Sequence, residues 1–462
     1  MKFDVLLKNC HLVDFKNDIE AVMDIGILGG KVEEVKTEIR SDLASELFDL
    51  QGALVVPGVI DPHMHASAWL GGRAAHKMLA LAGVTTAFDL AGPVDTTLAL
   101  ARKYGAGLNI CCLNSIRPGY TVEDSDPSAS ELQRFLQDSL TSGAIGYKLL
   151  GGHYPLSPEA TRRAIETAND SGAYVAFHAG TLENGSNLKG MEEALALAGK
   201  NRMHLAHINS YCRGQFDIPE NEAVAALRRL QEYPNVFAES YLSPYNGTSA
   251  KCTDGVPESL VTRRCLELAS YAPTEDGLRK AIQDGWANFV LERSGINVLV
   301  SGQDGVENWL AADKAGTVSF RVNPGSSRYL IAAGRKRDGS FVVNAFSSDG
   351  GGIPRNEIVP QGLALVKWGE LSLKEFVAKT SFNTAKMLGL SGKGHLGEGA
   401  DADITVIDEL CHDVLMTIVA GKIVMYRGLV VGQGATVLTT EQGCQAVKNA
   451  GLSASVISLF GR

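Results

Sequence analysis

The chain has 462 residues, 45% of them hydrophobic and 21% charged, and its 43 Lys and Arg against 52 Asp and Glu give a formal net charge of −9. This composition predicts a folded globular protein. The acidic balance disfavours nucleic acid as a partner, because phosphate binding requires a basic surface. No run of about 18 apolar residues is present, so no membrane span is expected. Eight scattered cysteines without a CxxC pair, and a first segment without a signal-peptide core, favour the cytoplasm.

Both ends of the chain carry short alternating apolar segments separated by glycines. The segments are 5–7, 11–13, 24–28, 31–35 and 53–56 at one end, and 404–407, 416–419, 422–426 and 429–431 at the other. Alternation of this kind, with glycine in the turns, is typical of β-hairpins. We expect residues 1–56 and 399–435 to pair into one small β-sandwich, followed by a C-terminal tail, 436–462, with no assigned role.

Between these ends, apolar strand-like runs alternate with amphipathic helical segments such as 157–169 and 191–198. The strand-like runs are 55–60, 84–90, 107–113, 145–150, 173–177, 203–206, 236–241 and 342–346. Eight such repeats predict an α/β fold, a (β/α)8 TIM barrel over residues 57–398. This span exceeds the ~250 residues of a plain barrel. We expect an insertion at about 242–341 to account for most of the surplus.

The first predicted barrel strand ends in a His-x-His pair, His63 and His65. Residues i and i+2 of a strand point to the same face, so the two imidazoles can bind one metal ion. Imidazole is a ligand suited to zinc and similar divalent ions. Two ordinary surface histidines beside a turn are the alternative interpretation.

Four further chemistry-bearing residues, Lys148, His178, His207 and Asp349, follow later apolar runs. In a barrel of parallel strands, residues at the carboxyl ends of the strands meet at one face. Each residue alone has an ordinary explanation, such as a snorkelling lysine or a turn-forming aspartate. Their joint placement at successive strand ends favours a shared metal site.

The order of these residues, with a split β-sandwich around a barrel, resembles the amidohydrolase superfamily of metal-dependent hydrolases. Three segments, 56–65, 383–390 and 394–408, are similar to the superfamily's opening and closing motifs. The resemblance implies two zinc ions, one bound by His63, His65 and Asp349 and the other by His178 and His207. It also implies that Lys148 reacts with CO2 to form a bridging carbamate, and that Asp349 is the catalytic acid and base. The implied reaction is hydrolysis of a carbon–nitrogen bond in an amide.

The motifs do not agree on one group of enzymes within the superfamily. Segment 143–158 resembles N-acyl-D-amino-acid deacylases, but the second strand has no metal-binding Cys, and Asn209 stands where those enzymes carry Lys. Lys148 instead resembles the bridging lysine of dihydroorotases, hydantoinases and isoaspartyl dipeptidases. We expect a small N-acyl amino acid or dipeptide-like substrate. A cyclic amide is the alternative, ahead of a mononuclear deaminase or a scaffold without metal.

Five polar residues near strand ends are candidate substrate contacts: Tyr154, Asn209, Arg213, Tyr241 and Arg355. An arginine in this group can bind a substrate carboxylate through two parallel hydrogen bonds. An ordinary surface arginine is the alternative for each. His76, His153 and His204 are expected to be structural or without a ligand role, and the resemblance implies a homo-oligomer.

Overall fold

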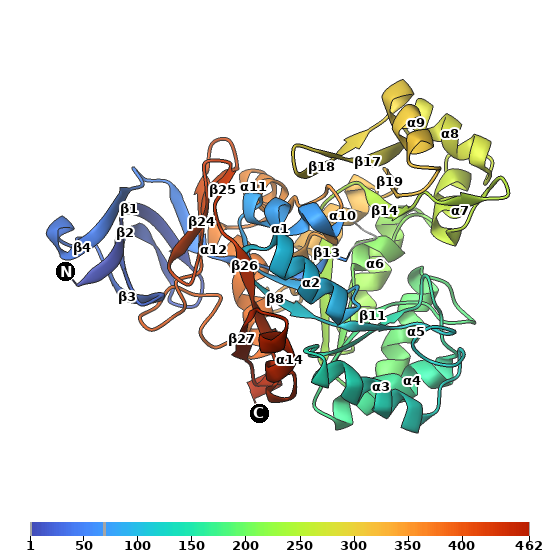
Figure 1. Ribbon diagram of the computed structural model, residues 1–462, viewed down its shortest axis with the longest axis horizontal. Helices are drawn as coiled ribbons and strands as arrows, with labels where there is room; N and C mark the ends of the chain where they lie inside the picture. Colours follow the sequence, from blue (N-terminus) through green and yellow to red (C-terminus); the bar gives the residue numbers. More distant parts are fainter. Residues whose placement is uncertain (1, 68–70, 462) are drawn as a thin grey trace.

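The computed structural model describes residues 2–67 and 71–461. Strands from both chain ends form one nine-stranded sheet, at the left of Figure 1, in the order β25-β24-β23-β22-β5-β1-β2-β3, with β4 paired to β1. The N-terminal strands are β1 Phe3–Asp14, β2 Ile19–Leu28, β3 Lys31–Lys36, β4 Ala44–Asp49 and β5 Leu54–Pro57. The C-terminal strands are β22 Ile404–Asp408, β23 Asp413–Val419, β24 Lys422–Tyr426 and β25 Leu429–Val430. The two ends meet where β22 pairs with β5, Ile404 opposite Pro57. The sandwich form and the boundaries of this unit stay predictions.

The centre of the molecule contains two six-stranded sheets, ordered β20-β13-β12-β11-β10-β9 and β21-β6-β7-β8-β26-β27. The pairings within them are parallel. The strands of the first sheet are β9 Asn114–Ile116, β10 Gly146–Leu150, β11 Tyr174–His178, β12 Met203–Leu205, β13 Val236–Tyr241 and β20 Ala345–Ser347. Those of the second are β6 Val59–His65, β7 Val84–Asp89, β8 Ala106–Cys112, β21 Gly350–Gly351, β26 Gly434–Thr439 and β27 Ser453–Val456. The α/β class with parallel sheets is therefore as predicted.

One predicted strand, 55–60, is divided by Gly58. Residues up to Pro57 belong to the nine-stranded sheet, whereas β6 begins at Val59 in a parallel sheet. A Cβ at Gly58 would lie 2.2 Å from Oγ1 of Thr85, so only glycine fits where the chain passes between the two sheets. Apolar periodicity alone could not detect this change of sheet.

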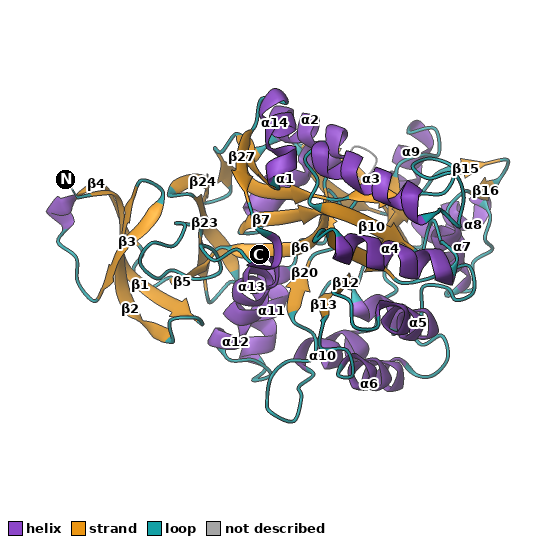
Figure 2. Ribbon diagram, turned by 90° about the horizontal axis from the view of Figure 1, so that it is seen from below, coloured by secondary structure: helices purple, strands orange, loops and turns teal. Residues whose placement is uncertain are grey.

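Helices pack around the parallel strands (Figure 2). They are α1 Gly72–Leu81, α2 Val94–Tyr104, α3 Ala129–Thr141, α4 Pro158–Asp170, α5 Leu188–Ala198, α6 Pro219–Leu230, α10 Gly325–Ala333, α11 Ile358–Lys367, α12 Leu373–Val377 and α13 Asn383–Leu388. Ser128 and Ser157 cap α3 and α4 by accepting a backbone N–H three residues on. In α4, Ala160, Ala164 and Ile165 are buried in the same apolar cluster as strands β10 and β11. The helices thus cover the strands with the apolar faces that their periodicity predicts.

The segment 242–341 has a sheet and a core of its own, at the upper right of Figure 1. Its sheet, ordered β14-β19-β17-β18, comprises β14 Asn246–Ser249, β17 Ala287–Arg293, β18 Ile296–Val300 and β19 Thr317–Phe320. Its helices are α7 Leu260–Glu267, α8 Glu275–Gln283 and α9 Gly302–Ala311, and β15 Cys252–Thr253 pairs with β16 Val256–Pro257. The fully buried Trp309 lies in its core cluster.

The C-terminal residues extend one of the parallel sheets. Strand β26 pairs with β8, and helix α14, Cys444–Asn449, leads to β27, which pairs with β26. Val437 and Val447 are buried in the same apolar cluster as Leu98 and Ile110. The expected tail therefore begins inside a strand. Within the described residues, no helix has the length and apolarity needed to cross a membrane, and the eight cysteines are free.

Candidate active site

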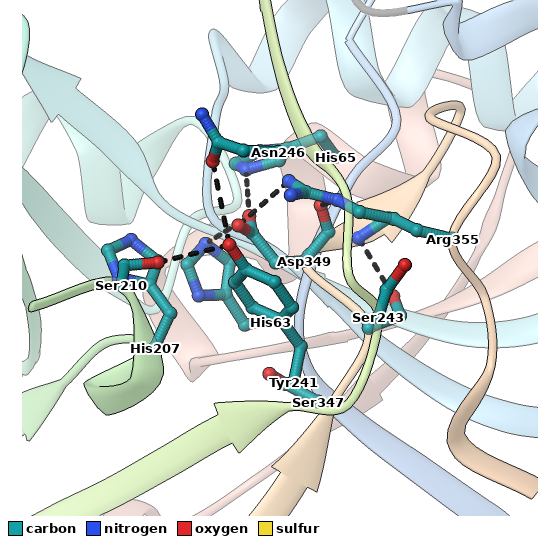
Figure 3. A network of polar contacts seen from close by, with 12 residues as sticks. His63, His65, His207, Ser210, Tyr241, Ser243, Asn246, Ser347, Asp349 and Arg355 are labelled. Atoms are coloured by element: carbon teal, nitrogen blue, oxygen red, sulfur yellow. Dashed lines mark hydrogen bonds and ion pairs between the residues drawn. The ribbon is translucent and has the colours of Figure 1, made fainter. Parts of the chain in front are cut away.

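His63, His65, Lys148 and Asp349 meet at one point among the parallel strands. Ligand atoms of His63, His65 and Asp349 all lie within 4.8 Å of one another. Nε2 of His65 is 2.9 Å from Oδ1 of Asp349, and Nζ of Lys148 is 2.8 Å from Nε2 of His63. Figure 3 shows the two histidines and Asp349 turned toward one another. Residues from three strand ends thus form one cluster.

His178 and His207 lie beside this cluster. Nε2 of His207 is 3.0 Å from Nδ1 of His178, and the rings of His207 and His63 are stacked with centroids 5.2 Å apart. The structure therefore brings all six predicted ligands together. Their individual roles toward a metal stay predictions.

Two of these residues have strained backbones. Asp349 and His207 have φ angles of 47° and 37°, in the left-handed region that non-glycine residues rarely adopt. The N–H of Asp349 donates to the carbonyl of His63 at 2.8 Å, and the N–H of His207 donates to Oε1 of Glu239 at 2.7 Å. Strain that is held in place by the surrounding hydrogen bonds is typical of functional sites.

Glu239, which was not among the residues selected from the sequence, orients the His63 ring. It is fully buried in β13, with Oε1 2.8 Å from Nδ1 of His63 and Oε2 accepting the hydroxyl of Ser347. Burial raises the pKa of Glu239, but its bonds to His204 and His63 outweigh this and hold it below the ordinary value. A carboxylate on the outer nitrogen of a histidine fixes the ring and its tautomer. An acidic residue inside an apolar strand was the available signal.

Asp61 forms a second support of this kind. It accepts the backbone N–H of Ser348 at 3.0 Å and the Ser348 hydroxyl at 2.5 Å. Burial raises the pKa of Asp61 to about 7. Ser347 and Ser348, which immediately precede Asp349, are therefore each bound to a buried carboxylate, and the loop carrying Asp349 is fixed on two sides.

Arg355 is paired directly with Asp349. Its guanidinium is 2.7 Å from Oδ2 of Asp349, and both side chains are almost fully buried. Burial raises the pKa of Asp349, but Arg355, His63 and His65 outweigh it and hold the pKa well below the ordinary value. Asp349 is therefore an ionised carboxylate at neutral pH. Because Arg355 already has this partner, its predicted substrate contact stays a prediction.

Burial shifts the nitrogen groups of the cluster toward their neutral forms, more completely for the imidazoles than for the Lys148 amine. Burial lowers the pKa of His63, His65 and His178 below the ordinary value and that of His207 to about 4. Burial also lowers the pKa of Lys148 to about 8, against the attraction of Asp349 and Glu239. Neutral imidazoles are the form that binds metal, and a neutral amine is the form that reacts with CO2.

Tyr241 and Arg213 form a polar network beside the cluster. The Arg213 guanidinium donates to Asn323 Oδ1 at 2.8 Å and to Ser210, Tyr241 and Asn246 at 3.2 Å. These acceptors are neutral, so the hydrogen bonds do not balance the charge of this half-buried arginine. The Arg355 guanidinium lies 4.9 Å from the centre of the Tyr241 ring. Tyr241 therefore contacts both arginines. Figure 3 shows Tyr241 beside Arg355.

The remaining sequence candidates take different positions. Oδ1 of Asn209 accepts the backbone N–H of Tyr241 at 3.1 Å, while its Nδ2 is buried without a partner among the described residues. Tyr154 packs against Tyr120, with ring centroids 5.9 Å apart. His204 lies 2.8 Å from the Tyr174 hydroxyl through Nδ1. The His153 ring, expected to have no ligand role, lies with its centroid 5.5 Å from that of His178.

The donor set fits divalent metal. Four neutral imidazoles and one ionised carboxylate converge, and Nδ1 of His65 and of His207 are buried without a hydrogen-bond partner among the described residues. Nitrogen and carboxylate ligands of this kind suit zinc. An unmodified Lys148 has no oxygen that could serve as a ligand to two ions. The fit of the site to a pair of ions therefore depends on carboxylation of Lys148.

Comparison with known proteins agrees with this chemistry. The profile of the "Amidohydrolase family" matches residues 358–425. A dihydroorotase from Trichlorobacter lovleyi is 25% identical over 433 residues, covering 88% of this chain and 89% of that protein. An L-hydantoinase from Paenarthrobacter aurescens is 23% identical, covering 88% and 86%. Among solved structures, an N-acyl-D-glutamate deacylase from Bordetella bronchiseptica complexed with zinc matches with a TM-score of 0.67 at 16% identity, covering 95% and 99%.

The profile match, the relatives and the solved structures make the chain similar to proteins of the amidohydrolase superfamily, the resemblance that the sequence indicated. Within that class, the relatives in sequence include a dihydroorotase and a hydantoinase, whereas the structural neighbours include an N-acyl-D-glutamate deacylase and a D-aminoacylase. These are hydrolases of carbon–nitrogen bonds other than peptide bonds, the enzyme class that the sequence indicated.

Proposed function

We propose that this protein is a binuclear zinc amidohydrolase that cleaves the amide bond of a small N-acyl amino acid or dipeptide-like substrate. The observation that carries the proposal is the convergence of His63, His65 and Asp349, with Lys148 on His63 and the His178–His207 pair beside them. His63, His65 and Asp349 would hold one ion, and His178 and His207 the other. Bound zinc would supply a nucleophilic water at neutral pH and polarise the amide carbonyl.

Asp349 moves the proton in this proposal. Its carboxylate is ionised, so it accepts the proton of the attacking water and then delivers it to the leaving nitrogen as the C–N bond breaks. The Arg355 pair on Oδ2 leaves Oδ1 to face His65 and the reacting centre. Glu239 and Asp61 hold the rings and the loop in place during this transfer.

Lys148 is proposed to carry a carboxylate derived from CO2. Its neutral amine would attack CO2, form an N–C bond and release a proton, giving an anionic carbamate with two oxygens. The amine is buried next to His63 and near the carboxylate of Asp349, where a bridging ligand between two ion sites would stand. An ammonium there would repel two divalent cations.

Arg213 is proposed to bind a carboxylate of the substrate. Among the described residues, its guanidinium donates to neutral acceptors, one of which is the Tyr241 hydroxyl. We expect Arg213→Met to raise KM about 10- to 100-fold for a substrate with a free carboxylate, because a charged hydrogen bond contributes ~1.5–3 kcal/mol. The primary amide of the same compound should lose no affinity. Equal losses for both compounds would contradict this role.

The predicted (β/α)8 barrel belongs to this proposal. Only Leu113 separates β8 from β9, and only Ser348 and Asp349 separate β20 from β21. The two parallel sheets therefore continue into one another through β8–β9 and β20–β21, while β26 and β27 extend the second sheet beyond β8. This continuity supports a closed ring of eight strand positions. The solved structures with similar folds include amidohydrolases over at least 94% of this chain.

The test is release of free amine from N-acyl-D-amino acids, N-acyl-L-amino acids and β-aspartyl dipeptides. The protein is loaded with zinc in bicarbonate, so that Lys148 can be carboxylated. We expect release from at least one class and a loss of about 10²- to 10⁴-fold in Asp349→Asn, the range for a general acid or base. Asp276→Asn, an exposed carboxylate of α8, is the matched control.

A cyclic amide is the second candidate, favoured by the dihydroorotase and hydantoinase relatives that cover 88% of the chain. Ring opening is followed as new carboxylate by pH-stat titration, since hydantoin opening frees no primary amine. Activity on rings alone, with none on the linear panel, would overturn the leading substrate class and establish the second.

A further inference from the structure

The insertion 242–341 reaches the candidate site through one buried asparagine. Strands β17 and β18 form a hairpin whose far end lies on helix α1 (Figure 1). Asn297, the second residue of β18, is only 6% exposed. Its Nδ2 donates to the carbonyl of Gly71 at 3.1 Å and to that of Gly352 at 2.6 Å. A single carboxamide thus connects two loops that are far apart in sequence.

Both loops belong to the active-site strands. Gly71 precedes α1 and follows the strand that carries His63 and His65, and Gly352 lies three residues after Asp349. The N–H of Gly352 donates to the carbonyl of His65 at 2.8 Å. Gly352, whose carbonyl accepts from Asn297, is therefore also hydrogen-bonded through its N–H to the backbone of a predicted metal ligand.

The junction has the close packing of a specific contact. Gly71 has a φ of +73°, and a Cβ there would lie 2.2 Å from Nδ2 of Asn297 and 3.0 Å from the carbonyl of Gly352. Glycine is required both by the backbone angle and by the approach of the carboxamide. Beside it, Lys77 of α1 donates to the carbonyl of Ser294 in the hairpin turn. Ile296, Asn297 and Arg355 also line one hollow at the surface, so the hairpin lies next to the arginine that pairs with Asp349.

The insertion also contacts the site on another side. Asn246 of β14 and Asn323, which follows β19, accept hydrogen bonds from Arg213. Nδ2 of Asn323 lies 3.0 Å from the Tyr241 hydroxyl. The insertion therefore contributes carboxamides to the ligand loops and to the Tyr241–Arg213 network.

We propose that Asn297 is a positioning residue through which the insertion sets the geometry of the loops carrying His65 and Asp349. The two hydrogen bonds of its Nδ2 act as a strap between these loops. The insertion is then part of the catalytic machinery, not an appendage of the fold. This inference rests on the proposed function only in taking His65 and Asp349 as catalytic-site residues. The effect of the two hydrogen bonds on the loops can be measured without substrate.

The test compares Asn297→Asp with Asn288→Asp by hydrogen–deuterium exchange of the full-length protein without substrate. Aspartate has the shape of asparagine but offers no N–H, and as an anion it repels both carbonyls. Asn288 lies in β17 of the same hairpin, with its side chain half-buried. We expect exchange in peptides spanning Gly350–Asn356 to rise about tenfold in Asn297→Asp and to stay unchanged in Asn288→Asp and in strands β22 and β23.

Unchanged exchange in Gly350–Asn356, or an equal rise in Asn288→Asp, would overturn the strap. Should Asn297→Asp not yield folded protein, Asn297→Gln and Asn297→Ser take its place under the same criterion, with Gln, which keeps the carboxamide, expected nearer to wild type. Zinc stoichiometry after dialysis is the second readout, and we expect it to fall in Asn297→Asp alone. A negative substrate panel with a positive exchange result would reject the proposed function and leave the strap standing.

Discussion

Two lysines, Lys148 and Lys379, are equally buried and yet lie in opposite chemical surroundings. Lys148 is 1% exposed and Lys379 0%, and burial lowers their pKa values to about 8 and about 7. Lys379, in the π-helix η4 Ala378–Phe382, donates to the carbonyl of Val343 at 2.7 Å and lies over the rings of Phe341 and Phe346. Lys148 faces His63 instead.

Burial and a lowered pKa therefore do not by themselves define a site. Val343 precedes strand β20, whereas Asp349 follows it, so the two lysines serve opposite ends of the parallel strands. At the amino end, one lysine satisfies a carbonyl and two aromatic faces. At the carboxyl end, Lys148 lies among imidazoles and near the carboxylate of Asp349. The neighbours decide the role.

Replacing each lysine by methionine gives the largest contrast. Lys148→Met removes the amine that would be carboxylated, so we expect hydrolysis to fall by at least about 10³-fold, and bound zinc to fall below that of the wild type. Lys379→Met keeps the carboxyl end of the strands intact, so kcat and zinc content should stay within about twofold. Amine release and metal analysis on both variants check this. A comparable loss of activity in both would break the comparison.

Glu239→Gln should have an intermediate effect at the same end. The carboxamide keeps the shape of the side chain but removes the negative charge from Nδ1 of His63. Loss of such an outer partner costs about 10- to 100-fold in metal affinity. Competition titration with a zinc chelator measures the change, with Glu232→Gln, on the surface, as the control. Unchanged zinc affinity would show that Glu239 serves only the fold.

Lys379 should affect the pH dependence of the unfolding free energy and not the activity. Its folded pKa of about 7 lies below the unfolded value near 10.4, so between these pH values the unfolded chain binds more protons and stability rises with pH. The unfolding free energy of wild type minus that of Lys379→Met should therefore rise from pH 7 toward pH 10, by at most about 1.4 kcal/mol per pH unit. Urea titrations at four pH values measure this. A flat difference would show that the pKa of Lys379 is ordinary in the folded state.

Much of this molecule could be predicted from its residues alone. Alternation of apolar runs with helical segments predicted parallel sheets covered by helices, and the spacing of His63 and His65 on a strand predicted their common face. Lys148, His178, His207 and Asp349 could be selected because polar residues after apolar runs lie at strand ends. The resemblance to the amidohydrolase superfamily followed from the same residues and from motifs near both ends of the barrel segment.

The contacts that hold these residues in place could not be predicted in this way. Glu239 on His63, Arg355 on Asp349, and Asn297 between Gly71 and Gly352 are pairings across sheets, loops and the insertion. The place of β26 beside β8 and the change of sheet at Gly58 are of the same kind. Local periodicity reports which face of an element is apolar, but not which distant backbone or side chain approaches it. That choice comes from packing of the whole chain, because each partner is selected by three-dimensional distance and not by sequence spacing.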